Sequence, residues 1–134
     1  MQNSLNQEGI TEIGQLYELA DTLGVGVVGF CMPESRAMSL MDEHGRCVIG
    51  LDNSKNYSQS EQKTMLAHEL GHCRTGAFYN QYTPLSLREK CEKKADEWAI
   101  LHCVPFDTLI FACKSGIRTR YELAEYFGVS ENFM

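Results

Sequence analysis

The sequence predicts an α+β fold in which a first helix is followed by a small sheet and then by a helical half. Apolar residues recur at helical spacing in TEIGQLYELADTLG, which begins at Thr11 and ends at Gly24. Three short β-type runs follow, VGVVGFC, AMSLM and RCVIGLD, and the turn-like segment DEHG joins the last two. After Asp52 the pattern is helical. We therefore expect a mostly antiparallel three-stranded sheet within a single domain over residues 1–134.

Capping-box patterns mark the helix starts of the second half, because a serine or threonine is followed three residues later by a glutamate. The pairs are Ser58 with Glu61, Ser86 with Glu89, and Thr119 with Glu122. They predict helices over 59–74, 87–103 and 120–127, with a shorter helix between Pro105 and Gly116.

The charge of the chain argues against direct contact with nucleic acid. The 134 residues carry a formal net charge of -6, whereas binding to phosphates needs a basic surface. The segment LAEYFGVS resembles the first helix and turn of a helix-turn-helix motif. However, the five residues after Val129 include no basic residue and are too few for a recognition helix. We expect a packing helix here, or a surface that docks a protein.

The cysteines show no pattern of a disulfide scaffold. There are six, and no two form a CxxC pair. The first residues, MQNSLNQEGITE, contain neither the basic nor the apolar region of a secretory signal, and no apolar run reaches the length of a membrane span. We therefore predict unpaired thiols in a cytoplasmic protein that does not enter a membrane.

The stretch TMLAHELGHC contains the residues of a hydrolytic metal site. His68 and His72 are four residues apart, so on a helix both imidazoles can reach one ion. Glu69 lies about 100° around the helix from His68, which places a base beside the ion without making it a ligand. Gly71 is unfavourable in the middle of a helix unless another segment must approach closely there.

A third ligand is expected from the next helix, because catalytic zinc usually has three protein ligands and one open position. Glu92 in SLREKCEKKADEWAI is the preferred residue, and Glu89 is the alternative. Asp96 falls on the same helical face as Glu92. Its carboxylate could orient a ligand histidine by accepting a hydrogen bond from the ring, although a solvated surface carboxylate is the alternative interpretation. Ala95 and Ala99 share this face and would let the two helices pack closely.

Two questions about the site stay open in the sequence. A donor to the oxyanion of the reaction is expected, and Tyr79, Tyr82 and His102 are candidates among which the sequence does not choose. A structural zinc site using Cys73 or Cys91 is the other possibility. It is disfavoured because neither cysteine shares the face of the predicted ligands and because four closed ligands would leave the catalytic glutamate without a role.

The combination of HELGH, EKKADEWA and a following VP resembles the ImmA/IrrE family of metallopeptidases, within the broader gluzincin-like group. The resemblance covers roughly Gly26 to Val129. Trp98 stands where phenylalanine is usual, and HCVP at 102–105 replaces the more common LLMP. Both departures concern packing and leave the chemistry unchanged.

The resemblance implies a role for each site residue. His68, His72 and Glu92 would bind zinc, with manganese as the alternative ion, Glu69 would be the catalytic base, and Asp96 would be the outer carboxylate. It further implies a cytoplasmic zinc endopeptidase that hydrolyses a partner protein, specifically a helix-turn-helix repressor of a phage or mobile element. A non-catalytic, metal-containing binding protein or anti-repressor remains the alternative.

Overall fold

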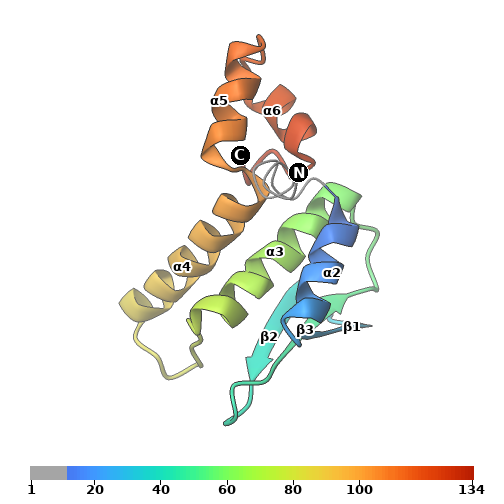
Figure 1. The fold of residues 1–134 in the computed structure, drawn as a ribbon. Coiled ribbons are helices and arrows are strands. Elements are labelled where there is room, and N and C mark those ends of the chain that lie inside the picture. The colour runs from blue at the N-terminus through green and yellow to red at the C-terminus, as the bar shows by residue number, and fades with distance from the viewer. Residues whose placement is uncertain (1–11) are drawn as a thin grey trace.

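The structure, a computed structural model, describes residues 12–134. Its elements in chain order are α2 (Ile13–Thr22), β1 (Gly26–Phe30), β2 (Ala37–Met41), β3 (Cys47–Asp52), α3 (Gln59–Thr75), α4 (Leu85–Cys103), α5 (Phe106–Lys114) and α6 (Arg120–Phe127) (Figure 1). The α+β class and the predicted order of elements are confirmed. The predicted helix start at Thr11 lies outside the described residues.

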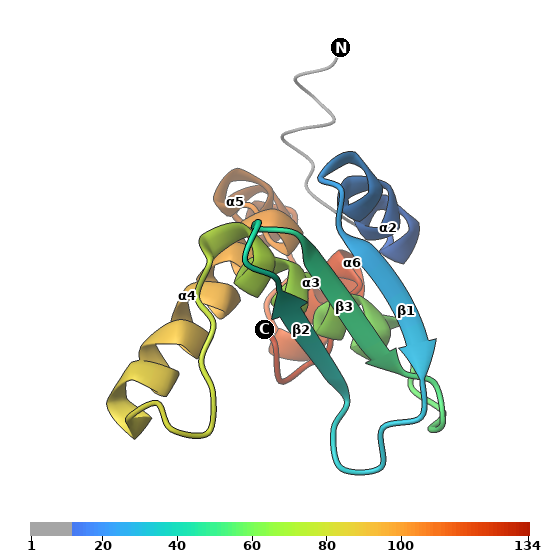
Figure 2. The ribbon, with the colours of Figure 1, turned by 90° about the horizontal axis from the view of Figure 1, so that it is seen from below.

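Helix α3 lies at the centre of the fold. It packs against α4 on one side and against the sheet on another, and α2 lies beside it (Figures 1 and 2). Its side chains Leu66 and Leu70 are fully buried and join Ile49 of β3 in the main hydrophobic cluster. Any residue carried by α3 is therefore held from several directions.

The sheet is mixed, with strand order β1-β3-β2. Strand β2 is antiparallel to β3, as the DEHG turn predicts, whereas β1 is parallel to β3. The reason lies in residues 31–36, which carry the chain from β1 to the far edge of the sheet. Strand β3 then returns through the gap between β1 and β2, so it runs in the same direction as β1.

The two faces of the sheet differ in exposure. Ile49 and Leu51 of β3 are buried on the face that packs against α3. No helix among the described residues 12–134 covers the opposite face, which is turned to the viewer in Figure 2. Its large apolar side chains are exposed, and they are Val28, Phe30, Met38, Leu40 and Val48.

The helix starts agree with two of the three predicted caps. Ser58 Oγ accepts a hydrogen bond of 3.1 Å from the Glu61 N–H, and the Glu61 carboxylate accepts one of 3.2 Å from the Ser58 N–H. The Thr119 hydroxyl caps α6 in the same way. The third prediction is wrong. Helix α4 begins at Leu85, and Ser86 lies inside its first turn without capping it.

Pro84 explains the earlier start of α4. It occupies the cap position, and its carbonyl accepts hydrogen bonds from the N–H groups of Leu87 and Arg88 at 3.0 and 3.1 Å. Since the helical hydrogen bonds reach back to Pro84, the helix gains two residues at its N-terminal end compared with the prediction.

Helices α3 and α4 come closest at Gly71. A Cβ atom added at Gly71 would lie 2.9 Å from the Cα of Ala95 and would also collide with the Ala95 carbonyl. Ala95 and Ala99 are both fully buried. The close approach predicted from these three small residues is therefore confirmed.

Two of the six cysteines are bonded to each other, so the prediction of unpaired thiols is wrong for them. Cys47 begins β3 and Cys73 lies near the end of α3, and a disulfide joins them across a Cα–Cα distance of 6.0 Å. The pair is separated by 26 residues and is created only by the packing of the helix on the sheet. The remaining cysteines are free, and they are Cys31, Cys91, Cys103 and Cys113.

A buried carboxylate fixes the segment between β3 and α3. Asp52 at the end of β3 accepts hydrogen bonds from the Met32 N–H at 3.1 Å and from the Tyr57 hydroxyl at 3.1 Å. It also accepts bonds from Ser54 and Lys55. The Ser54 hydroxyl and these other donors hold the pKa of Asp52 well below its usual value, despite burial.

The C-terminal helices are tied to α3 by a buried amine. Lys63 of α3 is only 2% exposed and donates a hydrogen bond to the carbonyl of Phe127, the last residue of α6. Ala124 and Phe127 are buried, so α6 is a packing helix. Within residues 12–134 no helix follows α6, and none has the length and apolarity that a membrane span requires.

Gly71→Ala is expected to lower the free energy of unfolding by about 1–3 kcal/mol, because the added methyl group forces two tightly packed backbones apart. Urea unfolding measures the change. Gly14→Ala in α2 is the control, since a Cβ there meets nothing within 4 Å. It should be neutral or stabilising by about 0.5–1 kcal/mol. Equal effects of the two substitutions would contradict the close contact.

The double substitution Cys47→Ser/Cys73→Ser is expected to destabilise the oxidised protein by about 2–4 kcal/mol, because the cross-link restricts the unfolded chain. In a reducing buffer the difference from the wild type should shrink. Cys31→Ser serves as the control, since Cys31 is exposed and free. Identical unfolding curves for oxidised wild type and the double variant would exclude the disulfide.

Candidate active site

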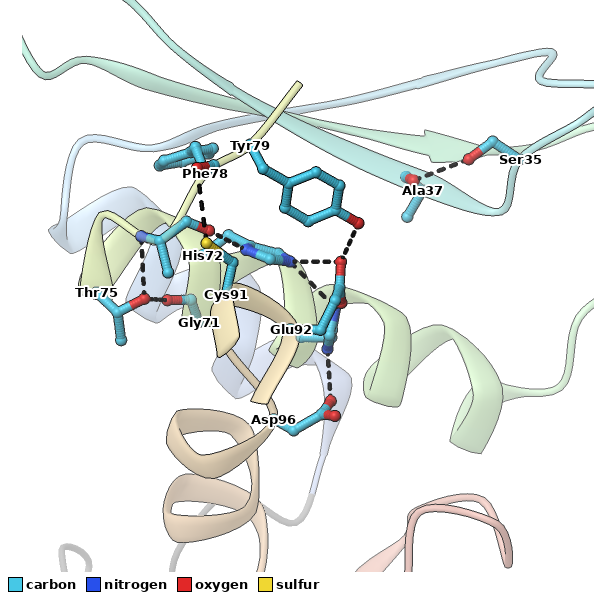
Figure 3. A network of polar contacts seen from close by, with 12 residues as sticks. Ser35, Ala37, Gly71, His72, Thr75, Phe78, Tyr79, Cys91, Glu92 and Asp96 are labelled. Carbon is cyan, nitrogen blue, oxygen red and sulfur yellow. Dashed lines mark hydrogen bonds and ion pairs between the residues drawn. The ribbon is translucent and has the colours of Figure 1, made fainter. Parts of the chain in front are cut away.

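Helices α3 and α4 bring three predicted ligands together. The ligand atoms of His68, His72 and Glu92 lie within 4.8 Å of one another. His68 Nε2 is 2.7 Å from Glu92 Oε2 and 3.2 Å from His72 Nε2, and His72 Nε2 is 3.5 Å from Glu92 Oε1 (Figure 3). Both histidines therefore present the same ring nitrogen, Nε2, to one carboxylate.

This arrangement fits a tetrahedral metal ion. Ligand atoms bound to zinc at 2.0–2.2 Å in tetrahedral geometry are separated from one another by about 3.3 Å. The two Nε2 atoms are 3.2 Å apart, and each lies near a different oxygen of Glu92, His68 at 2.7 Å from Oε2 and His72 at 3.5 Å from Oε1, so the separations lie on both sides of that value. Two nitrogens and one carboxylate oxygen would occupy three positions and leave a fourth open, which is the ligand set of a catalytic rather than a structural site.

The far nitrogen of each histidine is already occupied. His68 Nδ1 is 2.7 Å from Asp96 Oδ1, and His72 Nδ1 is 2.6 Å from the carbonyl oxygen of Ala77. Because a carbonyl can only accept, His72 Nδ1 carries the proton and Nε2 keeps its lone pair free for an ion. The Asp96 carboxylate likewise accepts from Nδ1 of His68, so Nε2, which now contacts Glu92, is the nitrogen that would face an ion. Asp96 thus lies at the place predicted for it.

The Ala77 carbonyl is a contact that the motif did not indicate. It is created by the end of α3, where Gly76 adopts a left-handed conformation with φ 68° and its N–H donates to the His72 carbonyl at 2.9 Å. The chain turns back at this glycine and places Ala77 beside the His72 ring. The sequence shows Gly76 as a residue that ends the helix, but it does not show that the following carbonyl contacts His72.

Tyr79 is the one oxyanion-donor candidate of the three that reaches the site. Its hydroxyl donates a hydrogen bond of 2.6 Å to Glu92 Oε1 (Figure 3). Tyr82 is 84% exposed, and His102 donates from Nδ1 to the Trp98 carbonyl and stacks on the Trp98 ring. The hydrogen bond to Glu92, together with burial, raises the pKa of Tyr79 to about 12, so its hydroxyl keeps its proton at neutral pH.

Glu92 is ionised in this setting. Burial alone would raise the pKa of its carboxyl group, but the Tyr79 hydroxyl and the two neighbouring histidines bring the pKa below its usual value. The charged form is the one that binds a metal ion. The alternative ligand, Glu89, is exposed. In the described residues, the group that could hold a metal ion contains His68, His72 and Glu92 and does not contain Glu89.

Glu69 lies beside the histidines at the meeting point of two hollows. It is 9% exposed. A hollow of about 450 Å³ extends from it past Arg36 and Glu61, and another of about 340 Å³ extends past Leu40 and Tyr79. Both hollows also touch Ala37 of β2. A cleft therefore runs along the outer edge of β2, with Glu69 near its middle.

The cysteines do not contribute to this group. Cys73 is bonded to Cys47, and the Cys91 thiol points to the Phe78 carbonyl, with a sulfur–oxygen distance of 3.7 Å. Over residues 12–134, the group that could hold a metal ion is formed by the two histidines and Glu92. The structural zinc alternative that uses cysteines has no support in this geometry.

Comparison with known proteins identifies the family. A search among curated proteins finds no match to the sequence. The family model Peptidase_M78, described as IrrE N-terminal-like domain, matches residues 20–134. This match includes the sheet, the cleft and all the residues of the candidate site, and it agrees with the resemblance read from the motifs. The chain therefore belongs to the Peptidase_M78 family of IrrE N-terminal-like, metallopeptidase-type domains.

Proposed function

We propose that the protein is a zinc-dependent endopeptidase that hydrolyses a peptide bond in a partner protein. The observation that supports this most directly is the convergence of His68 Nε2, His72 Nε2 and a Glu92 oxygen beside Glu69. The donor set of two imidazoles and a carboxylate suits zinc better than manganese, which prefers oxygen ligands. A zinc ion bound there would lower the pKa of water to about 7 and polarise a carbonyl group.

The residues of the chain supply the proton transfers. In this proposal Glu69, which lines the cleft beside the histidines, accepts a proton from the attacking water and delivers it to the leaving amine. Tyr79 keeps its hydroxyl proton and lies at the edge of the same group, so it is placed to donate a hydrogen bond to the oxyanion. His68 and His72 are held by hydrogen bonds at Nδ1 and need no rearrangement to bind an ion.

The cleft fits an extended peptide. The backbone carbonyl of Arg36 accepts a hydrogen bond of 2.9 Å from the backbone N–H of Asp52 in β3. In an antiparallel ladder, residues whose backbone groups bond to the neighbouring strand alternate with residues whose backbone groups point away from it. The backbone groups of Ala37 and Ser39 therefore point away from β3, toward the open edge that borders the site. Ser35 Oγ donates to the Ala37 carbonyl at 3.0 Å (Figure 3). A substrate segment could add to this edge as a further strand.

The substrate that we propose is a helix-turn-helix repressor of a phage or mobile element, cleaved in the cytoplasm. This part rests on the motif resemblance and on the acidic charge of -6, which suits a protein partner better than DNA. In the cytoplasm, thiol pools would tend to keep Cys47 and Cys73 reduced. The alternative is a metal-containing protein that inactivates its partner by binding, and the catalytic variant below distinguishes the two.

Asp96→Ala is expected to weaken zinc affinity by about 10–100-fold, because His68 loses the carboxylate that orients its ring. Competition with a chromophoric chelator measures the affinity, and circular dichroism checks that the fold is kept. Glu97→Ala is the matched control, since Glu97 is an exposed neighbour on the same helix. If Asp96→Ala binds zinc as tightly as the control, Asp96 is a surface charge only.

The wild type, co-expressed with the helix-turn-helix protein encoded nearest to its gene, is expected to convert that protein into a discrete fragment. Glu69→Gln should leave it intact, because the amide cannot accept the proton of water. Immunoblotting and mass spectrometry of the fragment give the readout. If both forms lower repressor activity equally and no fragment appears, the protein acts by binding and the peptidase proposal is wrong.

A further inference from the structure

The two hollows that meet at Glu69 differ in chemistry. The one that extends along the start of β2 and α3 carries charged side chains, which include Glu34 as well as Arg36 and Glu61, an ion pair of 3.1 Å. The other lies between β2 and the segment that follows α3. Beyond the catalytic group it is lined mainly by apolar and aromatic side chains, which are Met38, Leu40, Phe78 and Tyr79.

We propose that this second hollow, called here the Tyr79 hollow, selects substrates with a large apolar side chain next to the cleaved bond. The inference deepens the proposed peptidase function and rests on it. Leucine, methionine and phenylalanine are the side chains that we expect there. Leu40 is the residue through which the preference can be altered.

The position of the hollow supports a side chain next to the cleaved bond. Its walls include Glu69, His72 and Glu92, so the hollow begins at the reacting groups themselves. The aromatic side chains stand directly against the site, since the ring centroids of Phe78 and Tyr79 are 6.0 and 6.5 Å from that of His72. A residue two or more positions away from the bond would lie beyond this wall.

The chemistry of the walls supports an apolar occupant. The Tyr79 hydroxyl donates to Glu92, so it points to the reacting groups and not to a substrate side chain in the hollow. The volume of about 340 Å³ is large enough for a leucine or phenylalanine side chain. A carboxylate side chain would lose water there without gaining a matched partner, because it would face Glu69 and Glu92.

The sheet supplies a matched pair of positions for the test. Leu40 of β2 lines the hollow and is 64% exposed. Val48 of β3 is its direct cross-strand neighbour and is 45% exposed on the same outer face, but it does not line the hollow. Leu40→Glu and Val48→Glu therefore place the same charge on adjacent strands, and only the first places it at the wall of the cleft.

The experiment uses unstructured decapeptides in which the central residues are varied among leucine, phenylalanine, alanine, aspartate and lysine. Zinc-loaded wild type, Leu40→Glu and Val48→Glu are incubated with them, and cut positions are mapped by mass spectrometry. Binding of the same peptides to zinc-loaded Glu69→Gln is measured by fluorescence polarisation. Leucine or phenylalanine on one fixed side of the cut should be preferred over alanine and aspartate by about tenfold or more.

The variants give the sharper outcome. Leu40→Glu should reduce the apolar preference and favour lysine, whereas Val48→Glu should behave as wild type. Equal effects of the two substitutions would overturn the proposal and indicate that the whole outer face of the sheet docks the substrate. Cleavage without preference, or no peptide bound by Glu69→Gln, would also overturn it. Selective binding of apolar peptides without cleavage would support the hollow and count only against the peptidase function.

Discussion

The close contact between Gly71 of α3 and Ala95 of α4 is the constraint on which the candidate site depends. A glutamate reaches an ion on a neighbouring helix only if the two backbones are unusually near, and here a single Cβ at Gly71 would press into the Ala95 backbone. The preceding turn of α4 then places Glu92 Oε2 at 2.7 Å from His68 Nε2, and Asp96 lies equally close to Nδ1 of the same ring. The small residues Gly71 and Ala95 therefore determine both how closely the two helices pack and whether Glu92 can reach the histidines.

The end of α3 contributes as much to the site as its middle. Because Gly76 turns the chain back, the Ala77 carbonyl meets His72 and the Tyr79 hydroxyl meets Glu92, at 2.6 Å in each case. The loop thus fixes one ligand by its backbone and another by a side chain. A turn that would otherwise only end a helix orients two of the three residues that could hold a metal ion.

The parts that the sequence predicts are those encoded by short-range patterns. Ser58 and Thr119 could be identified as caps because each contact spans three residues, and the spacing of His68 and His72 is a property of any helix. Several contacts created by tertiary packing were missed, although the close approach of α3 and α4 at Gly71 was predicted. The disulfide, the burial of Lys63 against α6 and the parallel pairing of β1 have no local signature. The helix start at Leu85 was missed for a different reason, since Pro84 competed with an equally plausible serine cap.

The strand order explains why the central strand β3 is firmly held while the edge strand β2 borders an open cleft. With β3 in the centre, the disulfide at Cys47 and the buried carboxylate of Asp52 lie at opposite ends of one strand. The disulfide joins the sheet to α3, and Asp52 fixes the segments that follow β1 and β3. Among residues 12–134, strand β2 is left at the edge with one side unpaired, next to Glu69. An unpaired edge normally invites aggregation. Here it borders the candidate site, so under the proposed function the same feature that is a liability in a sheet would become the surface along which a substrate chain is aligned.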